Sequence, residues 1–197
     1  MEASFRLSTL APRPRRADAR RNRERILAAA TEAFTQSGLE SQVEDIARRA
    51  GVGVGTVYRH FPTKDALVQA LAEAHFARLA DILEAALDER GDPWDVFSAA
   101  IWRAAEPAAE DVAWCEIIAG RRSAVAGELP GQRRRAAAAT ELIARAQAAG
   151  TMRADAGVRD IQVIMCGLGH IATRQRAGAP HDWRRYLTIA LDGLRTR

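Results

Sequence analysis

The chain has 197 residues, of which 48% are apolar, so it can bury a sizeable core as one large domain or two small ones. It contains no run of 18 apolar residues and no apolar stretch before a small-residue cleavage site, so we expect neither a membrane helix nor a secretion signal. The net charge of +4 is uneven, because residues 1–64 carry 12 basic and 7 acidic side chains whereas residues 65–197 carry 17 basic and 18 acidic ones. A basic first third attracts polyanions, and nucleic acid is the commonest of these.

Seven arginines lie between Arg13 and Arg25. Within residues 1–17 they allow two interpretations, a solvated arm without regular structure or an arm that binds a polyanion. Asp18 can cap a helix, and the pattern after it predicts a first helix that runs to about Ser37 and ends at Gly38. The apolar face of this helix comprises Ile26, Leu27, Ala30, Ala33 and Phe34.

Two short helices are predicted next. Ser41 stands three residues before Glu44, which is the spacing of a capping box, and the helix after it ends at Gly51, where a left-handed cap is expected. Gly53 can cap the next helix, which is predicted at Val54–Phe61. At about 1.5 Å per residue this helix is about 12 Å long, close to the width of a DNA major groove.

The third helix has one apolar face, formed by Val54, Val57 and Phe61, and one polar face. Gly55 has no side chain, so the first turn can approach a surface closely. The outward positions are Thr56, Arg59 and His60, with Tyr58 on the flank. A helix, a tight glycine turn and a short helix with a polar outer face make a helix-turn-helix.

The segment VEDIARRAGVGVGTVYRHFPTKDAL, Val43 to Leu67, with the helix before it from Arg20 to Gly38, resembles the TetR family of bacterial transcriptional regulators. Pro62 closes the third helix. Thr63 caps a fourth helix, which starts at Lys64. Many relatives carry a serine cap where this chain has Gly53. The resemblance implies an all-α fold, with a three-helix DNA-binding domain over residues 18–64 and a larger helical domain for ligand binding and dimerisation over residues 65–197.

The resemblance also implies which residues contact DNA. Positions that match Tyr58, His60 and Lys64 usually bind phosphate in the family, and the N–H groups and dipole at the start of the second helix suit a phosphate as well. Taken singly, each of the three has a plainer interpretation, as a core cover, a surface histidine or an exposed charge. The DNA-binding set that we predict is Ser41, Gln42, Gly55, Thr56, Tyr58, Arg59, His60 and Lys64.

The larger domain is predicted to be helical throughout, with a break at residues 91–93, a short buried helix near residues 112–118, and a helix from residues 130–131 to Gly150. Pro107 is expected to end or kink the helix that contains it. In the family the ligand pocket lies inside this domain, and three of the four tryptophans fall between Trp94 and Trp114, which favours a cavity over a solid core made by the same residues. The predicted lining residues are Phe76, Leu79, Phe97, Ile101, Trp102, Trp114, Ile118, Met165 and His170.

The last two helices are apolar on more than one face, which suits burial against the chain's own core and against a second chain. The alternative is a pair of ordinary core helices. We favour a homodimer, because a twofold protein can read a palindromic site through two half-sites. The predicted seam comprises Ile161, Ile164, Leu168, Ile171, Trp183, Leu187, Ala190 and Leu194.

No catalytic or phosphate-binding motif is present and the four histidines are scattered, so we expect no enzyme activity, no metal and no cofactor. Cys115 and Cys166 do not make a disulfide framework; they fit a reducing cytoplasm, and buried thiols are favoured over a redox switch. The sequence therefore predicts a cytoplasmic dimeric repressor that binds double-stranded operator DNA and is released by a small, mostly apolar ligand. The alternatives are a ligand-independent regulator or an activator of the same fold, and a helical metal-binding protein or enzyme.

Overall fold

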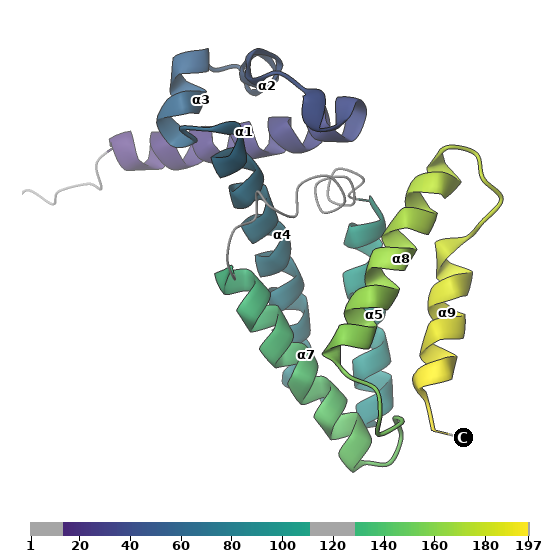
Figure 1. The fold of residues 1–197 in the computed structure, drawn as a ribbon. Helices are drawn as coiled ribbons and strands as arrows, with labels where there is room; N and C mark the ends of the chain where they lie inside the picture. The colour runs from purple at the N-terminus through teal and green to yellow at the C-terminus, as the bar shows by residue number, and fades with distance from the viewer. Residues whose placement is uncertain (1–13, 111–128, 197) are drawn as a thin grey trace, which may run out of the picture.

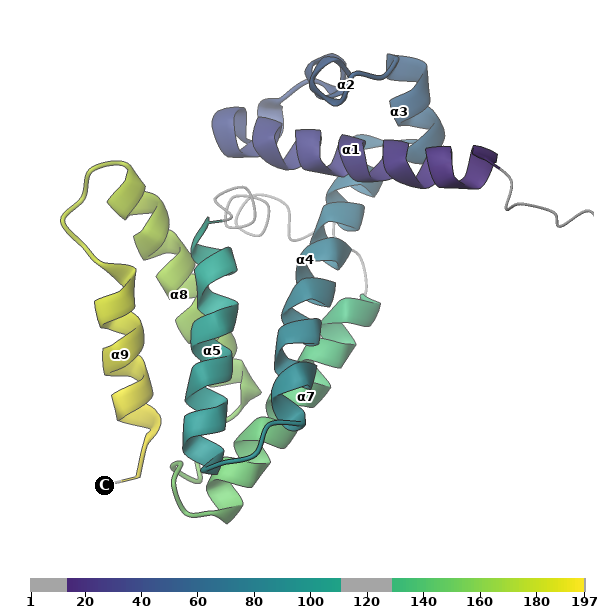
Figure 2. The ribbon, with the colours of Figure 1, turned by 180° about the vertical axis from the view of Figure 1, so that it is seen from behind.

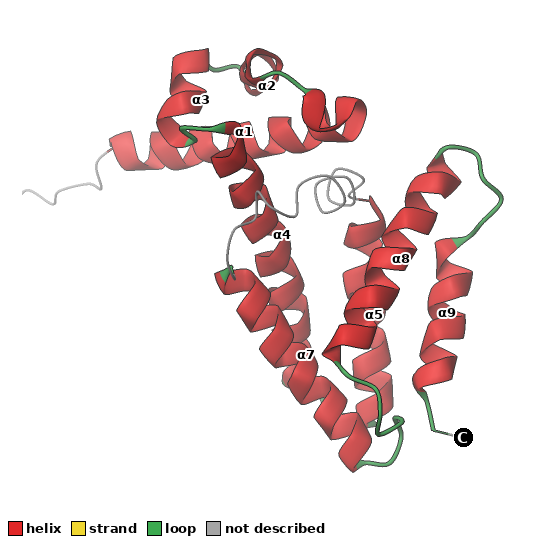
Figure 3. Cartoon of the chain, viewed as in Figure 1, coloured by secondary structure: helices red, strands yellow, loops and turns green. Residues whose placement is uncertain are grey.

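The computed structural model describes residues 14–110 and 129–196, and the regular elements in these ranges are helices (Figure 3). The only extended pairing between described residues is an isolated bridge that joins Met152 to Arg195. The all-α fold class is confirmed, and no helix in the described ranges is long and apolar enough to cross a membrane. The helices are α1 Pro14–Ser37, the 3-10 turn η1 Gly38–Glu40, α2 Val43–Ala50, α3 Val54–His60, α4 Lys64–Leu87, α5 Pro93–Glu110, α7 Pro130–Ala148, α8 Val158–Arg176 and α9 Trp183–Leu194.

Helices α1 to α3 form a unit at one end of the molecule, with α1 lying across α2 and α3 (Figure 1). Their apolar faces meet in a core that the first three turns of α4 complete, which we call the N-terminal core. Its most deeply buried large side chains come from all four helices and are Ile26, Phe34, Ile46, Val57, Leu67 and Val68.

The start of α1 differs from the prediction. The helix begins at Pro14, so neither the cap at Asp18 nor the end of the arm at residue 17 is correct. Proline is favoured in the first helical turn, where its missing N–H costs nothing. The Asp18 carboxylate instead accepts a hydrogen bond from the Arg21 guanidinium one turn later. The predicted end at Ser37 is confirmed, and Gly38 follows it with a φ of 61°.

Ser41 does not form the predicted capping box. The N-cap of α2 is Gln42, and the Ser41 hydroxyl donates to the carbonyl oxygens of Ala33 at 2.9 Å and Gly38 at 3.0 Å. Carbonyl groups at a helix end lack partners within the helix, so a nearby hydroxyl can satisfy them. Ser41 therefore fastens the start of α2 to the end of α1.

The turn between α2 and α3 has the predicted geometry. Gly51 adopts the left-handed conformation with φ 62° and ψ 40°, and Gly53 is the extended N-cap of α3. Helix α3 ends one residue earlier than predicted, at His60, and Phe61 is its buried C-cap. The Thr63 hydroxyl oxygen then accepts from the Ala66 N–H at 3.0 Å and caps α4 as expected.

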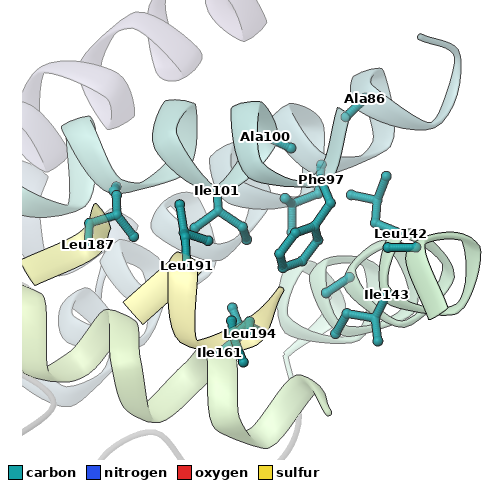
Figure 4. Close-up of a cluster of buried hydrophobic side chains, with 14 of the residues drawn as sticks. Ala86, Phe97, Ala100, Ile101, Leu142, Ile143, Ile161, Leu187, Leu191 and Leu194 are labelled. Carbon is teal, nitrogen blue, oxygen red and sulfur yellow. The ribbon is translucent and has the colours of Figure 1, made fainter. Parts of the chain in front are cut away.

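The rest of the chain packs around a second core. Helices α4 and α7 lie along each other, α5 packs against both, and α9 packs on α5 and α8 (Figure 2). The second core is filled by apolar side chains from α4, α5, α7, α8 and α9 that point toward one another (Figure 4). Helix α5 continues through Pro107 to Glu110, and the helix predicted near residues 112–118 lies outside the described residues.

Candidate nucleic-acid interface

Helix α3 presents a polar face to the outside because its apolar face is held in the N-terminal core. Val57 and Phe61 are buried there, as the wheel predicts. On the opposite side Tyr58 is 45% exposed, Arg59 is exposed, and Thr56 and His60 are half-buried. Seven residues of regular helix thus display hydroxyl, guanidinium and imidazole groups from one rigid support.

The first turn of α3 is open. A Cβ atom built at Gly53 or at Gly55 would meet no atom within 4 Å. Neither glycine is therefore required by packing inside the chain. At Gly55, which lies inside the helix, the absence of a side chain leaves the backbone accessible to a surface that approaches from outside.

Two arginines of α1, Arg23 and Arg25, support this region, although their sequence pattern alone predicts no position for them beside α3. The Arg25 guanidinium donates to the Gly51 carbonyl at 3.4 Å, and the Arg23 guanidinium lies 5.5 Å from the centroid of the Phe61 ring. Both side chains are exposed, so their charge remains available beside α3. The N-terminal half of α1 lies below α3 (Figure 1), which is how the basic cluster comes next to the helix-turn-helix.

The predicted residues at the start of α2 are only partly accessible. Ser41 is 6% exposed and its hydroxyl is used inside the chain, so its side chain is not a surface contact. Gln42 is exposed, and its side-chain amide donates to the Glu40 carbonyl at 2.9 Å. Lys64 is half-buried at the first residue of α4.

The residues predicted to line a ligand pocket separate into three groups. Phe97 and Ile101 are fully buried in the second core, with Phe97 against Trp94 at a ring distance of 5.8 Å. His170 is exposed on α8. The half-buried members are Phe76, Leu79, Trp102 and Met165, whereas Trp114 and Ile118 lie outside the described residues.

Cys166 is exposed, so the expectation of a buried thiol is wrong at this position, and Cys115 lies outside the described residues. The described residues contain no group of three or more side chains able to hold a metal ion.

The structure divides the residues predicted for the dimer seam into buried and half-buried members. Most of them pack into the chain's own second core; these are Ile161, Leu168, Trp183, Leu187 and Leu194. Ile164, Ile171 and Ala190 are half-buried. The apolar side chains that α8 and α9 leave outside are Val163, 68% exposed, Tyr186, 39% exposed, and Ile189, 53% exposed.

The chain matches two family models. Residues 26–71 match the bacterial regulatory proteins of the tetR family, and residues 92–196 match the C-terminal domain of SbtR-like transcriptional regulators. Together these matches extend over both cores of the structure.

Individual proteins give the same result. A TetR transcription regulatory protein from Mycobacterium vanbaalenii is 36% identical, with a TM-score of 0.63 and coverage of 93% of this chain and 100% of that one. An HTH-type transcriptional repressor from Mycobacterium tuberculosis is 42% identical over 76 residues, which are 34% of this chain and 40% of that protein. The chain thus spans about two fifths of the length of such curated relatives. The structure of a SmeT–triclosan complex is 25% identical, with a TM-score of 0.65 and coverage of 87% and 88%.

Proposed function

The chain belongs to the TetR family of bacterial transcriptional regulators, and from this premise we propose that it is a dimeric repressor that binds palindromic operator DNA and is released by a small molecule. The observation that carries the proposal is the exposed polar face of α3 on a buried apolar support. A ligand-independent regulator and an activator of the same fold are the alternatives.

We propose that DNA binding belongs to the part of the chain around the N-terminal core, and that effector binding and dimerisation belong to the part around the second core. Residues up to 64, with the N-terminal core, bind DNA, and residues from 65 onward bind the effector and the second chain. Helix α4 belongs to both parts, since Leu67 and Leu71 pack in the N-terminal core and Leu83 and Ala86 in the second.

On DNA, α3 enters the major groove with Thr56 and Arg59 toward base edges, while Tyr58, His60 and Lys64 reach phosphates. Gln42 and the N–H groups at the start of α2 hold a further phosphate. Arg23 and Arg25 add positive charge to this face, a contribution that depends on salt rather than on sequence.

The dimer forms through the outward faces of α8 and α9. Val163, Tyr186 and Ile189 give these faces apolar contacts, and Gly167 leaves open space around its backbone. Large apolar side chains exposed on two helices in contact with each other support a protein interface there. A twofold axis there would present two α3 helices to half-sites about 34–36 Å apart.

The effector binds beside α4 in the second domain, against half-buried apolar side chains such as Phe76, Leu79 and Met165. The similarity to SmeT, whose complex contains triclosan, supports a small-molecule effector. The effector must bind the DNA-free state more tightly, because a ligand with equal affinity for both states shifts nothing.

The proposal is tested by separating phosphate contacts from base contacts. With an operator recovered from bound genomic fragments, Lys64→Ala and Tyr58→Phe are expected to weaken binding to all sequences alike, and Lys64→Ala to reduce the salt slope by about 1. Arg59→Ala is expected to relax base preference at one position by about 1–3 kcal/mol. Fluorescence anisotropy over a set of single-base operator variants measures both effects.

Arg90→Ala, at an exposed arginine just after the end of α4, is the control and should bind like the wild type. If Arg59→Ala and Lys64→Ala kept full affinity and gave one common specificity profile, α3 would not be the reading helix.

Gly55→Ala tests whether the open first turn of α3 approaches DNA. Because the added methyl meets nothing within 4 Å in the free protein, the free energy of unfolding should stay the same or rise by about 0.5–1 kcal/mol. Operator affinity should nevertheless fall about tenfold, since the methyl group occupies space that the DNA backbone needs. Thermal melting and anisotropy on the same sample give the two values, and unchanged affinity would contradict the close approach.

A further inference from the structure

Arg135 occupies a position on α7 that belongs to its buried face. The inward stripe of this helix consists of Gly131, Ala138, Ala139, Leu142, Ile143 and Ala146. Arg135 lies on the same stripe, one turn after Gly131 and about one turn before Ala138, and it is half-buried. An arginine among small and apolar residues on a core face breaks the pattern that packing alone would favour.

The guanidinium of Arg135 lacks the acidic partners that the next arginine, Arg134, has. Arg134, the next residue, is exposed and binds Asp81 at 2.7 Å and Glu84 at 2.5 Å. For Arg135 no carboxylate lies within ion-pair distance in the described part of the chain, and its Nε atom is buried without a hydrogen-bond partner there. Burial also holds the pKa of Arg135 below its ordinary value, although a guanidinium remains charged at neutral pH.

The surroundings of Arg135 come from three helices. Its guanidinium lies 5.6 Å from the centroid of the Phe76 ring on α4, and Cys166 of α8 lies nearby. The buried His75 meets the same Phe76 ring edge-on at 5.9 Å. The carboxylate of Glu73 is already engaged, because the Gly131 N–H donates to its Oε1 at 3.0 Å and its Oε2 at 3.1 Å.

Arg135 also lies where the two cores meet. Leu129, the N-cap of α7, belongs to the N-terminal core, and Ala138 is the first residue of α7 in the second core, so Arg135 lies between the two. Phe76, which the guanidinium contacts, packs against the N-terminal core. A charge change at Arg135 therefore acts on the segment of α4 that connects the DNA-binding unit to the second domain.

A cation over an aromatic ring does not satisfy a buried N–H, and a buried donor left without a partner is costly. Such a group calls for an explanation, and a hydrogen-bond partner supplied by a bound ligand is one. The preferred partner of a guanidinium is a carboxylate or another oxyanion, which it can bind through two parallel hydrogen bonds.

We propose that Arg135 anchors the acidic head group of an amphipathic effector whose apolar body lies against Phe76 and the neighbouring half-buried side chains. This inference rests on the proposed function and narrows it, since the sequence alone predicts only a mostly apolar ligand. The shared chemistry is an apolar body that ends in a carboxylate.

The test compares each acid with its neutral partner by equilibrium dialysis without DNA, using decanoate against decanol and 2-naphthoate against 2-naphthalenemethanol. We expect the wild-type protein to bind at least one acid about tenfold or more tightly than its alcohol. Arg135→Met should abolish this preference while alcohol binding stays within about twofold, and Arg135→Lys should keep part of it. Arg133→Met, an exposed neighbour on α7, is the matched control and should bind like the wild type.

Thermal melting without ligand gives a second readout. Because Arg135→Met removes a half-buried charge whose Nε has no hydrogen-bond partner, its Tm should rise by about 3 °C or more. The proposal is overturned if the wild type prefers neither acid, if the preference persists in Arg135→Met, or if Arg135→Met melts several degrees lower and so shows a structural arginine. If the acid binds through Arg135 but does not release operator DNA, the anchor stands and the proposed release of the repressor fails.

Discussion

Replacing Ile189 with glutamate is expected to give a folded monomer that binds operator DNA about 100-fold more weakly. Ile189 is 53% exposed in the single chain, so the substitution should change the stability of that chain by about 0.5 kcal/mol or less. In a twofold interface two glutamates are introduced, and burying unpaired charges costs several kcal/mol. Light scattering at micromolar concentration gives the mass, circular dichroism the helix content, and anisotropy the affinity.

Leu187→Glu, two residues away, should behave differently. Leu187 is completely buried in the chain's own core, so its replacement should lower the helix content and the Tm whether or not the protein dimerises. Thr140→Glu on the exposed side of α7 serves as the control and should remain a dimer with wild-type affinity. A dimeric Ile189→Glu protein with unchanged DNA binding would show that the outward face of α9 is not the seam.

Gly131→Ala should lower the stability of the whole protein. A Cβ atom at Gly131 would lie 2.6 Å from the Ala77 nitrogen and 3.0 Å from the Phe76 carbonyl carbon, which are backbone atoms of α4 and cannot rotate away. Helices α4 and α7 must therefore move apart, at a cost of about 2 kcal/mol, and the Tm should fall by about 4–8 °C.

Gly55→Ala is the matched control, because the same methyl group at that position meets nothing within 4 Å. Differential scanning calorimetry of the two variants measures the contrast. Equal melting temperatures for Gly131→Ala and the wild type would mean that α7 can shift along α4 without loss.

The helix-turn-helix could be predicted closely because its boundaries depend on local chemistry. Gly51 ends α2 because the left-handed conformation suits glycine, and Thr63 caps α4 through an N–H only three residues away. Ser41 shows the limit of such reasoning. Its spacing to Glu44 fits a capping box, but the carbonyl of Ala33, eight residues earlier in the sequence, takes its hydroxyl hydrogen bond instead.

Which apolar face of α9 packs into the chain's own core could not be predicted from periodicity, because α9 has two such faces. One face carries Leu187 and Leu191, and the other carries Tyr186 and Ile189. A helical wheel does not show which of the two faces the rest of the chain covers. Arg135 was missed for a related reason. Among the many arginines of this sequence nothing local distinguishes it, and its position becomes unusual only once α4 and α8 lie against it.

Helix α4 runs without interruption from one core into the other, so a tilt of α4 within the second core would also move the DNA-binding unit. Its 24 residues span about 36 Å, so a tilt of about 5° around its far end moves the α3 end by about 3 Å, roughly the length of one hydrogen bond. In a twofold pair the two displacements add or cancel according to the direction of the tilt. The spacing of two half-sites is set by the helical repeat of DNA. In such a pair, a tilt of α4 by a few degrees would therefore be enough to move the two α3 helices out of register with them.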